Sequence, residues 1–123
     1  MELLYIKLLK DVHLQIGENC FFNRNCSITC VENIQIDSGC DFANNVVIVD
    51  HDHIVSSNDV EGELVAEPII IGDSVWVGAN VTILKGVTIG DGAVVAANSV
   101  VRNDAKPHTI VADAPAKLVK EIH

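Results

Sequence analysis

The chain has 123 residues, a formal net charge of −9 and 49% hydrophobic residues, but only 4% aromatic ones. This length allows one domain with a modest core, which must be built from aliphatic side chains. The negative charge argues against nucleic acid or an anionic membrane as partner, although a few local Lys or Arg residues could still hold an anionic ligand.

The first ten residues, MELLYIKLLK, show neither a basic start nor a small-residue cleavage site. No apolar run approaches the roughly 20 residues that are needed to cross a bilayer. We therefore predict no signal peptide, no membrane insertion and a cytoplasmic location.

From residue 16 the sequence steps in sixes: IGENCF FNRNCS ITCVEN and, after two extra residues, IDSGCD FANNVV IVDHDH. The fifth residue of a block and the first of the next are two apart, so both point to one side of a short strand. Each block is therefore predicted to be one strand and one tight corner. The extra residues, Ile34 and Gln35, predict a bulge or a widened corner.

Four cysteines, Cys20, Cys26, Cys30 and Cys40, fall in this half of the chain. Their spacings contain no C-x2-C pair, so they are a weak zinc signal, and a cytoplasmic location disfavours disulfides. Three of them occupy the inward fifth place of a block, which favours plain buried side chains.

Residues 46–58, VVIVDHDHIVSSN, place two histidines between aspartates at the end of the last block. This pattern suits a metal site, a general base with its helpers, or a solvated turn. Asp50 and Asp52 are either ordinary turn carboxylates or groups that orient an imidazole and stabilise its cation. The repeat then vanishes over residues 54–68, which predicts an excursion loop too long for an idle connection.

The repeat resumes over residues 71–106 as IGDSVW VGANVT ILKGVT IGDGAV VAANSV VRNDAK. Its GD, GAN, KG and DG segments supply residues that tolerate tight turns. Stacked coils of this kind bury a continuous aliphatic ladder, so we predict an all-β, single-domain parallel β-helix. Its coils are expected over about residues 12–53 and 69–106. Residues 107–123 predict a turn and a short C-terminal helix after Pro115.

The hexads resemble those of the hexapeptide-repeat acyltransferases, most closely the maltose and galactoside O-acetyltransferases and the polysaccharide O-acetyltransferases. The resemblance covers roughly residues 14–122 and is carried by FANNVVIVDHDH, PIIIGDSVWVGANVTILKGVTIGDGAVVAANSVV and IVADAPAKLVKEI. It implies a left-handed coil, against the general preference for right-handed crossovers. It also implies a homotrimer with sites between neighbours, and direct transfer of acetyl from acetyl-CoA to a hydroxyl of a sugar or glycan precursor, without a metal.

The family's general base precedes the excursion loop, and the hexad count places it at His53, with His51 an orienting neighbour or a bystander. The family's acceptor contacts carry over to Asn23 and to Trp76, whose outward place suits a ligand or a subunit contact. The family's cofactor contacts carry over to Ala79, Ala97, Arg102, Asn103, Lys117 and Lys120. The basic residues among them suit the phosphates of coenzyme A.

Some features depart from the family. Val31 stands where an acidic acceptor-binding residue is frequent, and the family's N-terminal helical cap is missing, so the acceptor stays open. Two alternative functions also remain. A γ-type carbonic anhydrase-like enzyme would bind zinc through three histidines, of which His51 and His53 could supply two. A non-catalytic hexapeptide-repeat protein would keep only the fold.

Overall fold

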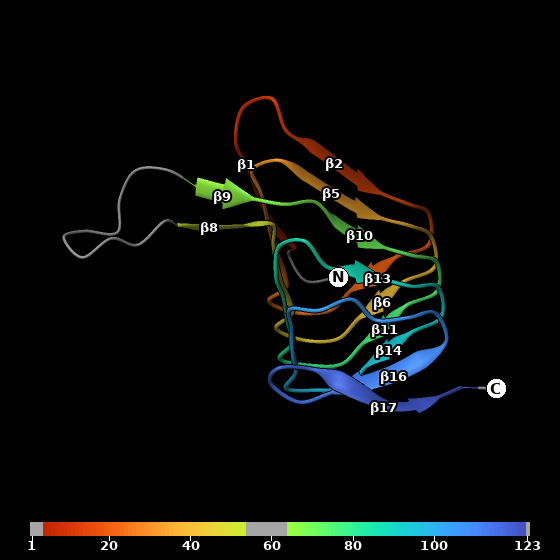
Figure 1. The fold of residues 1–123 in the computed structure, drawn as a ribbon. Helices are drawn as coiled ribbons and strands as arrows, with labels where there is room; N and C mark the ends of the chain where they lie inside the picture. The colour runs from red at the N-terminus through yellow and green to blue at the C-terminus, as the bar shows by residue number, and fades with distance from the viewer. Residues whose placement is uncertain (1–3, 54–63, 123) are drawn as a thin grey trace.

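The computed structural model describes residues 4–53 and 64–122, and within these ranges the regular elements are all β-strands (Figure 1). The chain winds into a parallel β-solenoid of about five turns, consistent with the left-handed β-helix expected from the hexads. No helix long and apolar enough to span a bilayer occurs in this described part of the chain.

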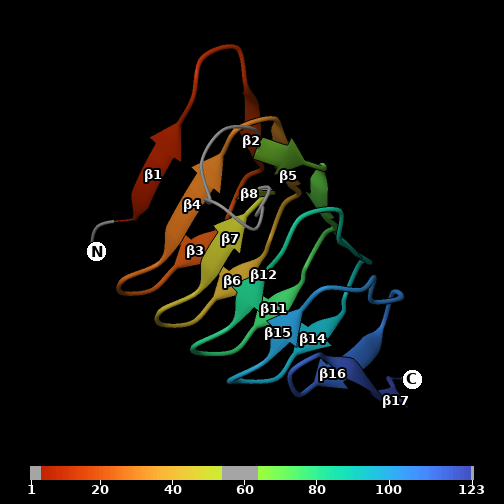
Figure 2. The same ribbon diagram turned by 60° about the vertical axis from the view of Figure 1, so that its left-hand side comes forward.

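The described strands of the coils stack into three faces of a prism (Figures 1 and 2). Face A contains β1 (Tyr5–Leu8), β4 (Ser27–Cys30), β7 (Val47–Val49), β12 (Thr82–Ile83) and β15 (Val100–Val101). Face B contains β2 (His13–Ile16), β5 (Asn33–Ile36), β10 (Ile69–Ile71) and β13 (Thr88–Ile89). Face C contains β3 (Phe21–Phe22), β6 (Asp41–Phe42), β11 (Trp76–Val77), β14 (Val94–Val95), β16 (Thr109–Ala112) and β17 (Lys117–Glu121). A separate hairpin joins β8 (His51–His53) to β9 (Leu64–Ala66).

The opening residue of each hexad points into the prism, as the spacing predicts. Parallel pairing places equivalent positions of successive coils above one another, for example Ile28 above Ile48 and Phe42 above Val77. The rings of Phe22 and Phe42 stack with centroids 4.5 Å apart. These side chains belong to one continuous hydrophobic core, so the predicted aliphatic ladder is confirmed.

The corner between faces C and A is turned by asparagines in the left-handed region, where their short polar side chains cost little. Their φ angles lie between 58° and 65°, at Asn25, Asn45, Asn80 and Asn98. The Asn45 Nδ2 amide donates to Asn80 Oδ1 of the next coil at 3.0 Å. Close stacking also explains Gly78, because a Cβ there would lie 2.7 Å from the Ala97 nitrogen.

The two extra residues of the first half, Ile34 and Gln35, lie within strand β5 on face B. β4 ends at Cys30 and β5 begins at Asn33, so the corner consists of Val31 and Glu32. Ile34 becomes an additional buried side chain on the longer strand β5. Ile34 and Gln35 pair in regular parallel register with β2 and β10, so the extra residues lengthen the strand, and neither the predicted bulge nor the predicted widened corner is seen.

The predicted C-terminal helix is wrong, because the tail forms two strands. β16 continues face C with Thr109 and Val111 buried, and β17 pairs with it antiparallel. Without a neighbour, β16 would expose a row of unpaired backbone N–H and C=O groups at the edge of the sheet. Pairing with β17 gives these groups hydrogen-bond partners. This pairing outweighs the helical propensity of AKLVKEI.

The solenoid also extends beyond its predicted limits. β1 pairs with β4 along its whole length, ahead of the expected start at residue 12, and β16 lies past the expected end at residue 106. Within the predicted excursion loop, residues 64–66 form β9, whereas residues 54–63 lie outside the described residues.

The cysteines are structural, as their places in the hexads predict. Cys26, Cys30 and Cys40 are buried and Cys20 is half-buried. The Cys40 thiol donates to the Gly72 carbonyl at 3.0 Å. Burial raises the pKa of the Cys40 thiol from 9.0 to about 11. Burial, followed by the nearby Asp50 charge, raises the pKa of Cys30 to about 11 as well.

Cys40→Ser should make the free energy of unfolding less sensitive to alkali. The thiol of Cys40 keeps its proton to a higher pH in the native protein than in the unfolded chain. Its contribution to the free energy of unfolding is therefore complete below about pH 9 and is lost as the pH rises towards about 11. One pKa unit corresponds to about 1.4 kcal/mol, which gives a loss of roughly 1–3 kcal/mol for Cys40. Serine keeps a donor without titrating in this range, and Ser99 already occupies a fifth place, with its hydroxyl donating to Ala96 at 2.7 Å. Urea unfolding across this pH window measures the effect; an identical pH dependence in both proteins would contradict it.

Candidate functional site

The histidine pair lies on β8, which leaves the prism at the corner between faces A and B, between β7 and β10 (Figures 1 and 2). β8 pairs antiparallel with β9, with His51 opposite Ala66 and His53 opposite Leu64. His53 is exposed and His51 is half-buried. Their ring centroids are 6.1 Å apart and the rings are nearly perpendicular, so one short strand presents two imidazoles.

The two aspartates beside the histidines have different surroundings. Asp50 is fully buried, and its carboxylate accepts hydrogen bonds from three backbone N–H groups at the corner between β4 and β5. These bonds are each 2.9 Å long and come from Val31, Glu32 and Asn33. Asp52 is exposed and its Oδ2 lies 3.1 Å from Lys85 Nζ. Asp50 is therefore part of the structure of the corner, whereas Asp52 forms a surface ion pair.

Lys85 and Gly86 fasten the base of the hairpin to the coil that follows. Besides Asp52, the Lys85 ammonium lies 4.0 Å from Glu67 Oε1, and the Gly86 N–H donates to the Glu67 carbonyl at 3.2 Å. Gly86 has φ +77°, and a Cβ there would lie 2.8 Å from Glu67 Oε2. The sequence showed Lys85 and Gly86 only as a turn, because nothing local connects them to β8.

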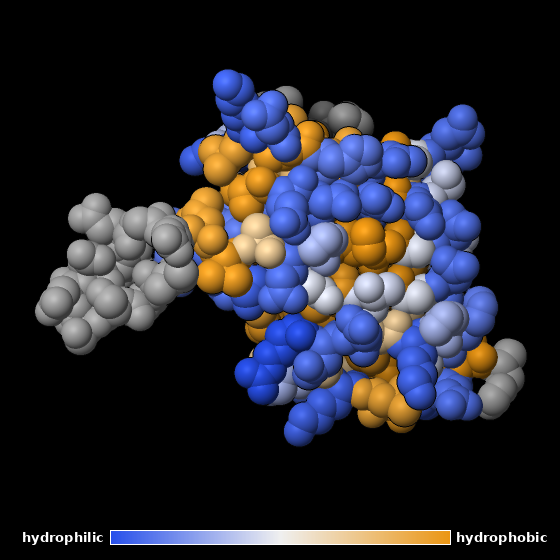
Figure 3. All heavy atoms as spheres, turned by 45° about the horizontal axis from the view of Figure 1, so that its top comes forward, coloured by the Kyte–Doolittle hydropathy of each residue, from blue (hydrophilic) through white to orange (hydrophobic). Residues whose placement is uncertain are grey.

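Apolar side chains gather where the hairpin leaves the body, and others lie among the polar side chains of the same face (Figure 3). The exposed apolar residues of β9 are Leu64 and Val65. Since isolated soluble proteins rarely expose clustered apolar side chains, such a patch is typical of a contact surface.

A groove of about 360 Å³ runs over face C beside Trp76, which is 57% exposed. The groove is lined mainly by small or apolar side chains of three successive coils: Ala43, Trp76, Gly78, Ala79, Val94, Val95, Ala96 and Ala97. Asn23 lies one coil above Ala43 in the same column, because its N–H donates to the Phe42 carbonyl. The structure therefore gathers Asn23, Trp76, Ala79 and Ala97 on one side of the prism.

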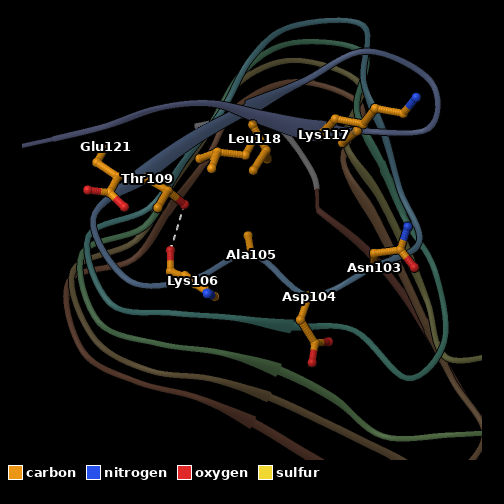
Figure 4. Close-up of a pocket in the computed structure, with 10 residues that line it drawn as sticks. Asn103, Asp104, Ala105, Lys106, Thr109, Lys117, Leu118 and Glu121 are labelled. Carbon is orange, nitrogen blue, oxygen red and sulfur yellow. Dashed lines mark hydrogen bonds between the residues drawn. The ribbon is translucent and has the colours of Figure 1, made fainter.

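A second cavity, of about 350 Å³, lies at the base of the solenoid between the last coil and β17 (Figure 4). Ala105 and Leu118 point into it from opposite sides, whereas the ammonium of Lys117 points away. Asn103 and Lys117 line this cavity, and Arg102 and Lys120 do not. The predicted nucleotide-binding residues thus lie near the base of the molecule but only two of them share a cavity.

The structure does not bring His53 to the groove within one chain. β8 leaves the prism at the corner between faces A and B, and that corner is opposite face C. The predicted base and the predicted acceptor contacts Asn23 and Trp76 therefore lie on different sides of the molecule. Any site that uses all three needs a second copy of the chain.

The grouping of possible metal ligands does not involve the histidines. Among residues 4–53 and 64–122, the three side chains close enough to share an ion are the exposed carboxylates Asp37, Asp73 and Asp91. They lie at the corner between faces B and C, where Asp73 and Asp91 accept backbone N–H bonds from the neighbouring coil. Exposed acidic groups are common without a bound ion.

A parallel β-helix with a small-residue groove on one face and histidines on a hairpin defines a class, the hexapeptide-repeat transferases. Two family models match this chain: the bacterial transferase hexapeptide (six repeats) over residues 68–103, and the hexapeptide repeat of succinyl-transferase over residues 13–49. Galactoside O-acetyltransferase of Escherichia coli (strain K12) is 35% identical over 112 residues, which are 90% of this chain and 55% of that protein.

Solved structures agree. A hexapeptide-repeat acetyltransferase from Vibrio cholerae superimposes with a TM-score of 0.84 at 31% identity, covering 99% of this chain and 74% of that one; it has also been solved with acetyl-CoA. A maltose O-acetyltransferase from Clostridium difficile 630 gives a TM-score of 0.83 at 33% identity, and the match covers 96% of this chain and 67% of that one. The chain belongs to the hexapeptide-repeat acyltransferase family. It spans 55% to 59% of the length of the curated relatives it matches.

Proposed function

We propose that this protein transfers an acetyl group from acetyl-CoA to a hydroxyl of a sugar or glycan precursor in the cytoplasm. The observation that carries the proposal is the groove beside Trp76, whose small and apolar lining suits the pantetheine arm of coenzyme A. Related structures of the same family contain coenzyme A or acetyl-CoA. Ala79 and Ala97 would border the arm through their backbone groups.

The proposed reaction is a direct transfer with His53 as the general base. The imidazole takes the proton of the acceptor hydroxyl while the hydroxyl oxygen attacks the thioester carbonyl. The carbon–sulfur bond then breaks, and the coenzyme A thiolate leaves and takes up a proton. An acyl-enzyme on the buried cysteines is disfavoured, because Cys26, Cys30 and Cys40 are inaccessible and burial raises the pKa of each thiol.

We further propose that three copies complete the site between them. The resemblance implies a homotrimer, and the opposite placement of β8 and face C supports it, because β8 of one copy would then meet the groove of the next. The exposed Leu64 and Val65 on β9 and the exposed Trp76 would be covered in this contact.

Sedimentation velocity is expected to show a stable trimer at micromolar concentration. Leu64→Asp should weaken the assembly, because a carboxylate would replace an apolar side chain of the proposed contact. Lys106→Asp, a charge change at the base of the solenoid, is the matched control and should leave the trimer intact. A stable monomer of the unmodified protein would contradict this model.

The phosphates of coenzyme A are proposed to meet Arg102, Asn103, Lys117 and Lys120. Replacing both Lys117 and Lys120 with alanine should raise the KM for acetyl-CoA more than it lowers kcat, since these exposed groups bind the donor but do not react. The KM should also rise with ionic strength in the parent and less so in the variant, because exposed charges are screened by salt. Unchanged KM in the double variant would remove these residues from the donor site.

Binding of acetyl-CoA, measured by calorimetry, tests the proposal without knowledge of the acceptor. We expect saturable binding that is lost when a bulky side chain fills the groove, as in Ala97→Trp. Metal analysis of the same sample separates the alternatives. Stoichiometric zinc without acetyl-CoA binding would favour the carbonic anhydrase-like enzyme. A protein that contains no zinc and binds no acetyl-CoA would favour the non-catalytic alternative.

A further inference from the structure

The buried carboxylate of Asp50 is committed to accepting hydrogen bonds. A buried charge is costly unless its oxygens are satisfied. Oδ1 accepts from the Val31 N–H, and Oδ2 accepts from the N–H groups of Glu32 and Asn33. The Cys30 thiol lies 3.6 Å from Oδ2 and adds a weak donor. These four described contacts, from three N–H groups and one thiol, are all donors to the carboxylate.

His51 brings one further group to the same carboxylate. Its ring atom Nδ1 lies 3.4 Å from Asp50 Oδ1. Because a carboxylate that accepts from three N–H groups cannot donate, a hydrogen bond at this long contact requires the proton on Nδ1 of His51. In the neutral ring the other nitrogen, Nε2, is then left with a free lone pair.

The ring of His51 is also held in place. Its side chain is only 13% exposed, and β8 is paired with β9 at this residue. His53 is two residues further along and so lies on the same face of β8, with its ring centroid 6.1 Å from that of His51. Asp52 lies on the other face, paired with Lys85. One face of the strand thus presents a fixed imidazole next to an exposed one.

We propose that His51 is a second acceptor-binding residue, positioned by Asp50, and that its Nε2 accepts a hydrogen bond from a second hydroxyl of the acceptor. The inference rests on the proposed function, in which His53 takes the proton of the hydroxyl that is acetylated. Two imidazoles side by side fit a substrate with two neighbouring hydroxyls, as on a sugar ring. The acceptor class is therefore a vicinal diol, and an isolated alcohol lacks the second contact.

The Asp50–His51 pair is tested by NMR, without reference to activity. In ¹⁵N-labelled protein at about pH 8.5, where an ordinary imidazole is neutral, long-range ¹H–¹⁵N correlations should show His51 with the proton on Nδ1. His51→Phe assigns the signal, and His53→Phe should leave it unchanged. In Asp50→Asn, the side-chain amide can turn a donor towards His51, and the proton should move to Nε2. A wild-type His51 with its proton on Nε2 would overturn the pairing, even if Asp50→Asn does not fold.

The acceptor contact is tested with methyl β-galactopyranoside and its single deoxy analogues. His51→Phe keeps the shape of the ring and removes the nitrogens, so KM for the glycoside should rise about 3- to 10-fold, the usual value of one neutral hydrogen bond, with kcat and the KM for acetyl-CoA nearly unchanged. For one deoxy analogue, the KM with the parent protein should exceed the KM of the intact glycoside by the same factor. With His51→Phe, the KM of that analogue should equal the KM of the intact glycoside.

An unchanged acceptor KM in His51→Phe, or a collapse of kcat, would overturn the binding role of His51. A parent protein that binds acetyl-CoA but acetylates no glycoside would overturn the sugar-hydroxyl assignment and the diol contact together. The NMR measurement would still decide whether Asp50 holds His51, so the two failures can be told apart.

Discussion

Replacing His53 with alanine should lower acetyl transfer by about 10²–10⁴-fold, the range typical of losing a general base. The variant should fold normally, because the side chain is exposed and lies outside the hydrophobic core. It should bind acetyl-CoA nearly as the parent does, because His53 does not line the groove and is assigned to the acceptor hydroxyl, not to the donor. Steady-state kinetics with saturating donor, together with calorimetric binding, measure both properties.

His51→Ala is the matched control, because it removes the same functional group two residues away. It should cost far less in kcat, since we assign it to acceptor binding. A reversed order, with His51→Ala the more damaging change, would show that the hexad count through IVDHDH is wrong and that His51 is the base. Loss of bound zinc together with activity in both variants would support the carbonic anhydrase-like alternative.

Asp50→Ala should lower the free energy of unfolding by about 3–5 kcal/mol, the usual cost of removing one partner from a buried charged network. The variant leaves the N–H groups of Val31, Glu32 and Asn33 without their carboxylate, in a corner that is partly closed to water. Urea unfolding at a fixed protein concentration measures the change.

Asp52→Ala is the control for that experiment. Asp52 is exposed and paired only with the Lys85 ammonium among its described contacts, and surface ion pairs contribute less than about 1 kcal/mol. Equal losses in the two variants would contradict the different roles that the structure gives to the two aspartates.

Much of the fold follows from the spacing of single residues. Ile71, Val77 and Ile83 recur every six residues, and a strand with alternating sides leaves no other place for them than the interior of the coil. The GAN segment that contains Asn80 was equally readable as a corner, because few side chains tolerate the left-handed conformation. These features are local, so one sequence suffices to predict them.

Features that depend on distant pairing were missed or mistaken. The tail AKLVKEI has helical propensity, and only the open edge of β16 makes it a strand. β1 lacks the turn residues of a hexad and is held by pairing with β4. The burial of Asp50 did have a local signal, since Asp50 lies two residues after the inward Ile48 and so points to the same side. That its carboxylate meets Val31 depends on the coil above and could not be read from the chain.

The sequence predicts the residues of the candidate site but not their arrangement. The family resemblance, together with the hexad count, predicts His53, Trp76 and Asn23 as site residues, and the structure places the last two on one side of the prism and His53 at the opposite corner. A repeat specifies the position of a residue within its coil, but not which surface of a second copy it meets. The Lys85 contacts with Asp52 and Glu67 were likewise invisible, because they join coils that are far apart in sequence.

The most direct test of the central claim is acetyl transfer from radiolabelled acetyl-CoA to a panel of sugars and nucleotide sugars, followed as label in the acceptor and as free coenzyme A thiol. We predict that label and thiol appear together, in equal amounts, only when a hydroxyl acceptor is present, and that both are lost in His53→Ala. Release of the thiol without label in the acceptor would contradict the assignment as an O-acetyltransferase. A protein that neither binds acetyl-CoA nor releases the thiol would contradict it as well.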